Sequence, residues 1–157
     1  MSFTTFMPQA LSEARAAAAR GEVPVGAVIV SAEGDILAMA GNETRAGLDP
    51  TAHAEMLAIR RACAAVGSER LTGCTLWVTL EPCPMCAAAI AHARIARLCY
   101  GASDPKSGGI ETGPRLYDHP NLHHRPEVIP GLEENACRDI LRKFFEAVRF
   151  QSDTANS

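Results

Sequence analysis

The chain has 157 residues, of which 47% are hydrophobic and 21% are charged, a balance typical of an ordinary globular protein. No repeat or linker divides it, so we expect a single domain over residues 1–157 with one hydrophobic core. A net charge of −3 argues against a general nucleic-acid binder, although it leaves a local basic patch open. We find no apolar stretch suited to a signal peptide or a membrane span, and we expect a cytoplasmic protein.

The N-terminal part predicts a helix followed by a pair of strands. Residues 8–20 place small or apolar side chains at helical spacing, and Gly21 follows as a helix terminator. Residues 25–31 and 36–40 are rich in β-forming side chains. The turn residues Glu33-Gly34-Asp35 between them predict a strand pair.

A second helix is expected to begin near His53. Asp49-Pro50-Thr51 provides the start signal, and apolar residues then recur at helical spacing. We expect these to form the buried stripe of the helix: Met56, Ile59, Cys63 and Val66.

The rest of the chain alternates strands with helices. The expected elements are a central strand at 75–80, a helix at 84–94, a strand at 95–101, a short strand at 128–129 and a last helix at about 133–149. The last helix carries an apolar face made of Ile140, Leu141, Phe144, Phe145 and Val148. This alternation predicts an α/β fold, a three-layer α/β/α sandwich around a sheet of about five strands.

Six cysteines in a cytoplasmic chain indicate metal ligands and buried thiols more often than disulfides. Four of them lie in apolar or element-terminal surroundings, and we expect them to be small buried hydrophobes: Cys63, Cys74, Cys99 and Cys137.

The other two cysteines belong to a pair of motifs that carry chemistry. His53-Ala54-Glu55 and Pro82-Cys83-Pro84-Met85-Cys86 together supply one imidazole and two thiols. Zinc prefers such ligands, and a catalytic zinc site keeps one of its four positions open for water. In this order the two motifs match the pattern H-x-E…P-C-x-x-C, which is typical of zinc deaminases acting on nucleobases. We therefore expect one Zn²⁺ per subunit, bound by His53, Cys83 and Cys86.

The expected helix starts explain why these residues suit a metal. Cys83 and Cys86 are three residues apart, so their side chains leave the first turn of a helix on the same side. The helix dipole favours the thiolate form that zinc requires. Glu55, two residues beyond His53, is placed to shuttle the protons of a water at the open position.

Two other interpretations of the motifs remain at this point. Cys83 and Cys86 can be read as a redox pair, which ignores His53 and Glu55. Alternatively, the zinc is structural, with a fourth ligand among Cys63, Cys74, Cys99, Cys137, His92, His119, His123 and His124.

From about Glu22 to Arg149 the chain resembles the bacterial tRNA adenosine deaminases, which convert adenosine to inosine at the anticodon wobble position. The resemblance rests on Glu-Val-Pro-Val-Gly-Ala-Val at 22–28, Asn42, Asp-Pro-Thr-Ala-His-Ala-Glu at 49–55, Thr-Leu-Glu-Pro-Cys-Pro-Met-Cys at 79–86 and Asp-Pro-Lys-Ser-Gly at 104–108. It implies a cytidine deaminase-like fold with a central mixed sheet, a homodimer, and the tRNA anticodon loop as partner. At the C-terminus the chain departs from relatives that end in a basic tail.

The resemblance also implies roles for further residues. Asn42 is expected to hydrogen-bond the target base, inside a pocket walled by Val23, Pro24 and Leu80. Other residues are expected to contact the RNA around that base: Asp104 and Lys106 at the sugar and phosphate, and His124, with His119 and His123, by stacking. Two alternatives stay open, a free-base or nucleoside deaminase of the same superfamily and a non-catalytic zinc-stabilised binding module.

Overall fold

The computed structural model of the chain describes residues 4–156, so the two ends of the expected 1–157 domain lie outside the described residues. Its elements in chain order are α1 (Met7–Ala19), β1 (Gly26–Val30), β2 (Ile36–Gly41), α2 (Ala54–Val66), β3 (Thr75–Leu80), α3 (Pro84–His92), β4 (Arg97–Ala102), the 3₁₀ turn η1 (Leu116–Asp118), β5 (Glu127–Ile129) and α4 (Glu134–Ala155). Every helix and strand expected from the sequence is present, with shifts of a few residues at most ends.

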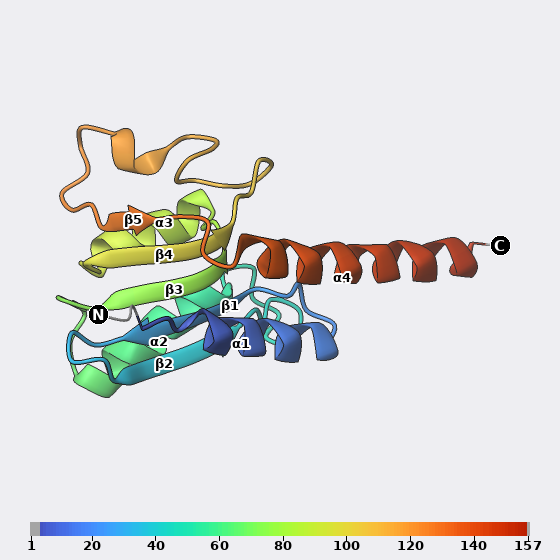
Figure 1. The fold of residues 1–157 in the computed structure, drawn as a ribbon, viewed down its shortest axis with the longest axis horizontal. Coiled ribbons are helices and arrows are strands. Elements are labelled where there is room, and N and C mark those ends of the chain that lie inside the picture. The colour runs from blue at the N-terminus through green and yellow to red at the C-terminus, as the bar shows by residue number, and fades with distance from the viewer. Residues whose placement is uncertain (1–3, 157) are drawn as a thin grey trace.

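The five strands form one mixed sheet in the order β2-β1-β3-β4-β5 (Figure 1). β1 pairs antiparallel with both β2 and β3, whereas β3, β4 and β5 are parallel. As a result β2, β3 and β4 all run in one direction, and their carboxyl ends meet at the same edge of the sheet. This edge is where the functional residues gather.

Helices cover both faces of the sheet, which confirms the expected α/β/α sandwich. One core cluster joins α2 and α3 to the sheet residues Ala27, Ile29 and Tyr100, and a second joins α1 and α4 to Val28 and Val30. Neighbouring residues of β1 therefore point into different cores, as the period of a strand requires. Among the described helices, none combines the length and apolarity that crossing a bilayer requires.

The buried face of α2 differs from the one expected. The side chains that face the sheet are small, Ala54, Ala58 and Ala62, each with no exposed surface. Of the predicted stripe, Ile59 and Cys63 are partly buried and pack against the core, whereas Met56 lies outside the core clusters and Val66 is 45% exposed, so the prediction is wrong for these last two. Helical spacing identifies an apolar face but not which face is buried, and the alanines let α2 lie close to the sheet.

Helix α4 continues beyond the expected end and projects away from the sheet (Figure 1). Near its start Cys137 is fully buried, and the apolar face is only partly covered further along. Phe145 and Val148 are each 44% exposed. The apolar face of this helix is therefore confirmed, but its outer half lies outside the core.

Candidate zinc centre and substrate pocket

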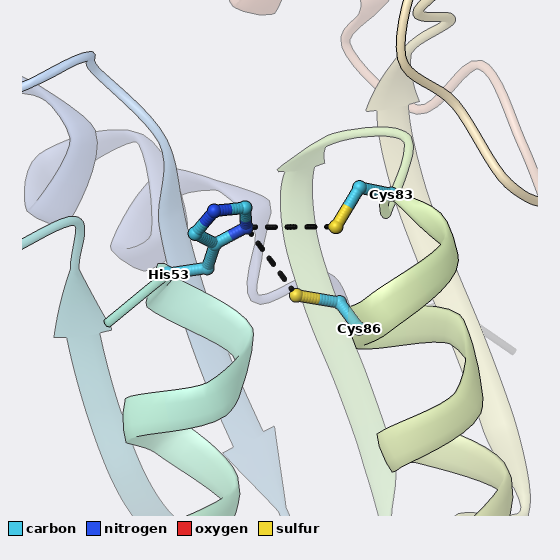
Figure 2. Close-up of side chains that lie close together, drawn as sticks. All are labelled: His53, Cys83 and Cys86. Atoms are coloured by element: carbon cyan, nitrogen blue, oxygen red, sulfur yellow. Dashed lines mark hydrogen bonds between the residues drawn. The ribbon is translucent and has the colours of Figure 1, made fainter. Parts of the chain in front are cut away.

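The three predicted metal ligands come from the first residues of two neighbouring helices. His53 directly precedes α2, Cys83 directly precedes α3, and Cys86 lies in the first turn of α3. Pro84 occupies the first position of α3, where a missing N–H costs no helical hydrogen bond. α2 and α3 lie side by side on the same face of the sheet, so the two helix starts bring the imidazole and both thiols together (Figure 2).

The spacing of these ligand atoms fits a single zinc ion. The Nδ1 atom of His53 lies 3.6 Å from the Sγ of Cys83 and 3.6 Å from the Sγ of Cys86. Tetrahedral zinc with ordinary Zn–N and Zn–S bonds holds such atoms about 3.6 Å apart. Nδ1 is thus the imidazole nitrogen that faces the metal position. Within residues 4–156, no further histidine, cysteine or carboxylate belongs to this group, which disfavours a closed four-ligand structural site.

The two thiols hold protons unequally in the absence of a metal. The Cys86 thiol beside it lowers the pKa of Cys83 to about 4, whereas its contact with Cys83, together with burial, raises the pKa of Cys86. The contact with Cys83 also raises the pKa of His53. Zinc requires both thiolates and a neutral imidazole, so metal binding must displace protons from this cluster.

Glu55 lies directly behind the ligands in a dry environment. It is 3% exposed, and its Oε1 atom has no hydrogen-bond partner among the described residues. Burial is the main reason that the pKa of Glu55 is raised above its ordinary value. A desolvated carboxylate with one unpartnered oxygen, beside a metal position, is suited to taking up a proton from water held there.

Glu55 and two of the ligands open into a cavity of about 230 Å³. Its walls include Asn42, which follows β2, Leu80 at the end of β3, and Asp104, which follows β4. These elements share the carboxyl edge of the sheet, where ligands bind in open α/β sheets. The remaining lining residues are Val23, Val25, Thr44, His53, Glu55, Glu81, Cys83 and Ser107.

Asn42 is fixed in one orientation. Its side-chain oxygen accepts a hydrogen bond of 2.8 Å from the backbone N–H of Ala54, the first residue of α2. Because only the oxygen can accept, the amide NH₂ is the end left to face a ligand. The side chain therefore offers the cavity a donor, where the sequence alone allowed either a donor or an acceptor.

The structure brings most of the predicted substrate residues to this cavity, but not all. Val23, Leu80 and Asp104 line it, and Lys106 lines an adjoining cavity of about 610 Å³. Pro24 is buried and lies outside the lining of both cavities.

His124 is placed elsewhere. Its Nε2 lies 2.7 Å from the carbonyl oxygen of Ile95, which precedes β4. The amino end of β4 is at the opposite edge of the sheet from the zinc ligands. The structure therefore does not bring His124 to the site within one chain, and its expected role in stacking stays a prediction.

Glu81 is a site residue to which the sequence analysis assigned no role. It lies between β3 and Cys83 in the chain, lines the small cavity and is only 2% exposed. Burial alone raises the pKa of Glu81, but the backbone N–H groups of Asp104, Ile110, Thr112 and Glu111 outweigh burial and lower it. The sequence signal that could have identified Glu81 was its position, a charged residue placed directly between a buried strand and the helix that carries Cys86.

Comparison with known proteins agrees with this site. Residues 2–102 match the family model described as the cytidine and deoxycytidylate deaminase zinc-binding region. A tRNA-specific adenosine deaminase from Agrobacterium fabrum is 56% identical over 146 residues, covering 93% of this chain and 95% of the relative. The chain belongs to the tRNA-specific adenosine deaminase family.

Solved structures give the same result for the fold. A structure from a study of A-to-I editing by tRNA:A34 deaminases at the wobble position of transfer RNA has a TM-score of 0.85 and 56% identity. The match covers 87% of this chain and 98% of that one. A guanine deaminase from Bacillus subtilis is more distant, with a TM-score of 0.63 and 34% identity over 95% of this chain and 94% of that chain. The cytidine deaminase-like fold expected from the resemblance is confirmed.

Removing one ligand tests the zinc assignment. We expect the Cys86→Ser variant to hold well under one zinc per chain after dialysis, because a hydroxyl is a poor replacement for a thiolate ligand. Elemental analysis of the purified protein measures this directly. The control is Cys63→Ser, a half-buried thiol outside the ligand group, which should keep the metal. Full zinc occupancy in the Cys86→Ser protein would contradict the assignment.

Proposed function

We propose that this protein deaminates adenosine to inosine at the wobble position of tRNA anticodons. The observation that carries the proposal is the three-ligand group beside a buried Glu55 with one unpartnered oxygen, in a chain whose relatives include proteins named tRNA-specific adenosine deaminase. A binding module would not need a desolvated carboxylate next to an open metal position. We also place the protein in the cytoplasm, where its six free thiols are stable.

The proposed reaction replaces the 6-amino group of adenine with oxygen from water and releases ammonia. His53, Cys83 and Cys86 would hold the zinc, which when bound would lower the pKa of water to about 7 and supply a nucleophile near neutral pH. Glu55 accepts a proton from the attacking water on a carboxylate oxygen and delivers it to the N1 atom of the ring. A second proton passes through the same carboxylate to the departing amino group, which leaves as ammonia.

Other residues hold the base in place during this exchange. Asn42 presents its NH₂ donor, which suits the acceptor nitrogens of a purine ring. The apolar side chains of Val23 and Leu80 line the same cavity and exclude water from the base. Asp104, at the rim, is proposed to contact the sugar next to the flipped nucleotide.

The adjoining cavity supports RNA as the substrate. It shares Val23, Leu80, Asp104 and Ser107 with the small cavity, so the two cavities adjoin. The outer part is lined by cationic side chains and by apolar residues of α4: Lys106, Arg142, Arg149, Leu141, Phe145 and Val148. Proteins that bind single-stranded nucleic acid usually combine cationic side chains, which contact the phosphates, with aromatic side chains, which stack on the bases.

A homodimer is the proposed assembly. The outward side of α2 carries Met56 and Val66, and the outward side of α3 carries Met85, Ala88 and Ala89. The two helices are neighbours, so they present a joint apolar strip, and the small side chains of α3 allow another element to approach closely.

The substrate is tested by comparing RNA with free bases. We expect inosine to form in a tRNA with wobble adenosine, and no ammonia to be released from guanine, cytosine or free adenosine. Mass spectrometry of the digested tRNA and an ammonia assay provide the readouts. The Glu55→Gln protein is the matched control, since it should keep zinc and lose turnover by roughly 10²- to 10⁴-fold. Ammonia released from guanine alone would move the protein to the alternative, a free-base deaminase.

Arg149 tests the contribution of α4. We expect the Arg149→Ala variant to raise KM for tRNA and to reduce the salt dependence of binding by about one counterion, with kcat little changed. Titration of binding at several salt concentrations measures the slope. Arg138→Ala is the control, because Arg138 pairs with Glu134 at the start of the helix and does not line the cavity. Equal effects of both substitutions would argue against a defined RNA path along α4.

Sedimentation tests the assembly. The wild-type protein is expected to sediment at twice its chain mass of 16.7 kDa. Placing a long charged side chain in the strip, as in Ala89→Arg, should shift it to the monomer. Ile36→Arg is the control on an exposed strand position that is 43% accessible. A monomeric wild-type protein at micromolar concentration contradicts this proposal.

A further inference from the structure

Glu81 is a buried carboxylate that forms no ion pair with a cationic side chain among the described residues. It joins β3 to the turn that carries Cys83, and its own backbone N–H donates to the carbonyl of Ala102 at 2.8 Å. Burying an isolated carboxylate is costly unless hydrogen-bond donors surround it.

The loop 104–112 supplies those donors. The Oε1 atom of Glu81 accepts one hydrogen bond, from the backbone N–H of Asp104 at 3.0 Å. The Oε2 atom accepts from the backbone N–H groups of Ile110, Glu111 and Thr112 at 3.1, 3.0 and 3.2 Å. The hydroxyl of Thr112 donates to the same oxygen at 3.0 Å. One carboxylate thus ties together both ends of the loop.

The loop fits around the carboxylate without spare room. A Cβ atom on Gly108 would lie 2.4 Å from the Oε2 of Glu81 and 2.2 Å from the Oγ1 of Thr112. Next along the chain, the N–H of Gly109 donates to the carbonyl of Pro82 at 2.8 Å, and a Cβ there would meet the nitrogen of Pro84 at 2.7 Å. The loop therefore rests directly on the turn that carries the zinc ligand Cys83.

The residues positioned by this contact are those at the mouth of the site. Asp104 and Ser107 line the small cavity together with the zinc ligands, and Lys106 and Ser107 line the outer one. Asp104 in turn accepts from the backbone N–H groups of Lys106 and Ser107 through its Oδ1, at 3.2 and 3.1 Å. The position of this whole wall relative to the metal follows from where Glu81 holds Asp104.

We propose that Glu81 is a positioning residue for the nucleotide substrate: its two oxygens fix the Asp104–Ser107 wall at a set distance from the zinc turn. The inference rests on the proposed function for the identity of the substrate. The oxygens of Glu81 accept hydrogen bonds from the loop, so we expect Glu81 to act through Asp104, with its effect on substrate binding and not on the chemical step.

The Oε2 atom of Glu81 accepts more hydrogen bonds than the Oε1 atom, and this difference makes a selective test possible. In the Glu81→Gln variant the amide oxygen satisfies the four donors at the Oε2 position, and the NH₂ group then opposes the N–H of Asp104. We expect KM for tRNA to rise about tenfold, with kcat within about twofold and one zinc per chain retained. Backbone amide exchange should accelerate at Asp104 while Ile110, Glu111 and Thr112 stay protected.

A second pair of variants keeps the test decisive if Glu81→Gln folds poorly. Thr112→Val removes the hydroxyl whose single hydrogen is shared between the Oε2 of Glu81 at 3.0 Å and the carbonyl oxygen of Asp104 at 2.8 Å, with almost no change in shape. It should raise KM by a smaller factor, whereas Thr112→Ser, which keeps the hydroxyl, should retain the wild-type value. Glu33→Gln, in an exposed turn, controls for the loss of a negative charge.

The outcomes separate this inference from the proposed function. Failure of the wild-type protein to make inosine would contradict the proposed function. The zinc content and amide exchange of the variants would still test whether Glu81 positions Asp104. A fall in kcat at unchanged KM, or loss of zinc, would assign Glu81 to the metal site and overturn the inference. Unchanged KM and unchanged exchange at Asp104 in the Glu81→Gln protein would overturn it as well.

Discussion

The common direction of β2, β3 and β4 is the constraint on which the site depends. Because β1 is antiparallel to both of its neighbours, β2 runs the same way as the parallel pair beyond it. The segments that leave these three strands therefore emerge at one edge, carrying Asn42, Cys83 and Asp104. α2 and α3 begin at that edge, so two helix N-termini face one point and their dipoles favour the thiolates that hold the metal. The metal-ligand group, the proposed base-binding Asn42 and the Asp104–Ser107 wall are therefore consequences of one strand arrangement.

The loops at this edge are held by buried carboxylates. Glu22 is 1% exposed and accepts hydrogen bonds from the N–H groups of Arg45 and Ala46, in the loop that follows Asn42. Glu81 plays the corresponding part for the loop that follows β4. A carboxylate accepts several amide hydrogens at once, so a single side chain can satisfy a loop that has no sheet or helix partner. The two loops flank the cavity, and Glu55 lies between them with an oxygen left unsatisfied for chemistry.

Local sequence patterns predicted the elements and each half of the zinc group, because these depend on short-range spacing. Cys83 and Cys86 lie within one helical turn of each other, so their relative position follows from the helix. The pairing of this half with His53, 30 residues away from Cys83, came from the match to a known motif and not from spacing. The burial of α2 was mispredicted in part because its fully buried side chains are alanines, while Met56 lies outside the core and Val66 is exposed. The anchoring role of Glu81 depends on donors more than twenty residues away, and the placement of His124 depends on which edge of the sheet its loop reaches. Contacts of that range are set by the assembled fold, which spacing does not encode.

The acidic net charge is compatible with a polyanionic substrate once burial is considered. Three carboxyl groups, those of Glu22, Glu55 and Glu81, are counted in the formal net charge of −3 but are almost inaccessible to solvent. The surface charges at the mouth of the cavity, where Lys106 and Arg149 lie beside the apolar face of α4, are the ones that the proposed RNA substrate would meet. Screening limits the reach of charges elsewhere on the surface to about 8 Å at physiological salt. The arrangement of charges at the mouth of the cavity, more than the net charge of the chain, therefore decides whether a phosphate backbone can bind there.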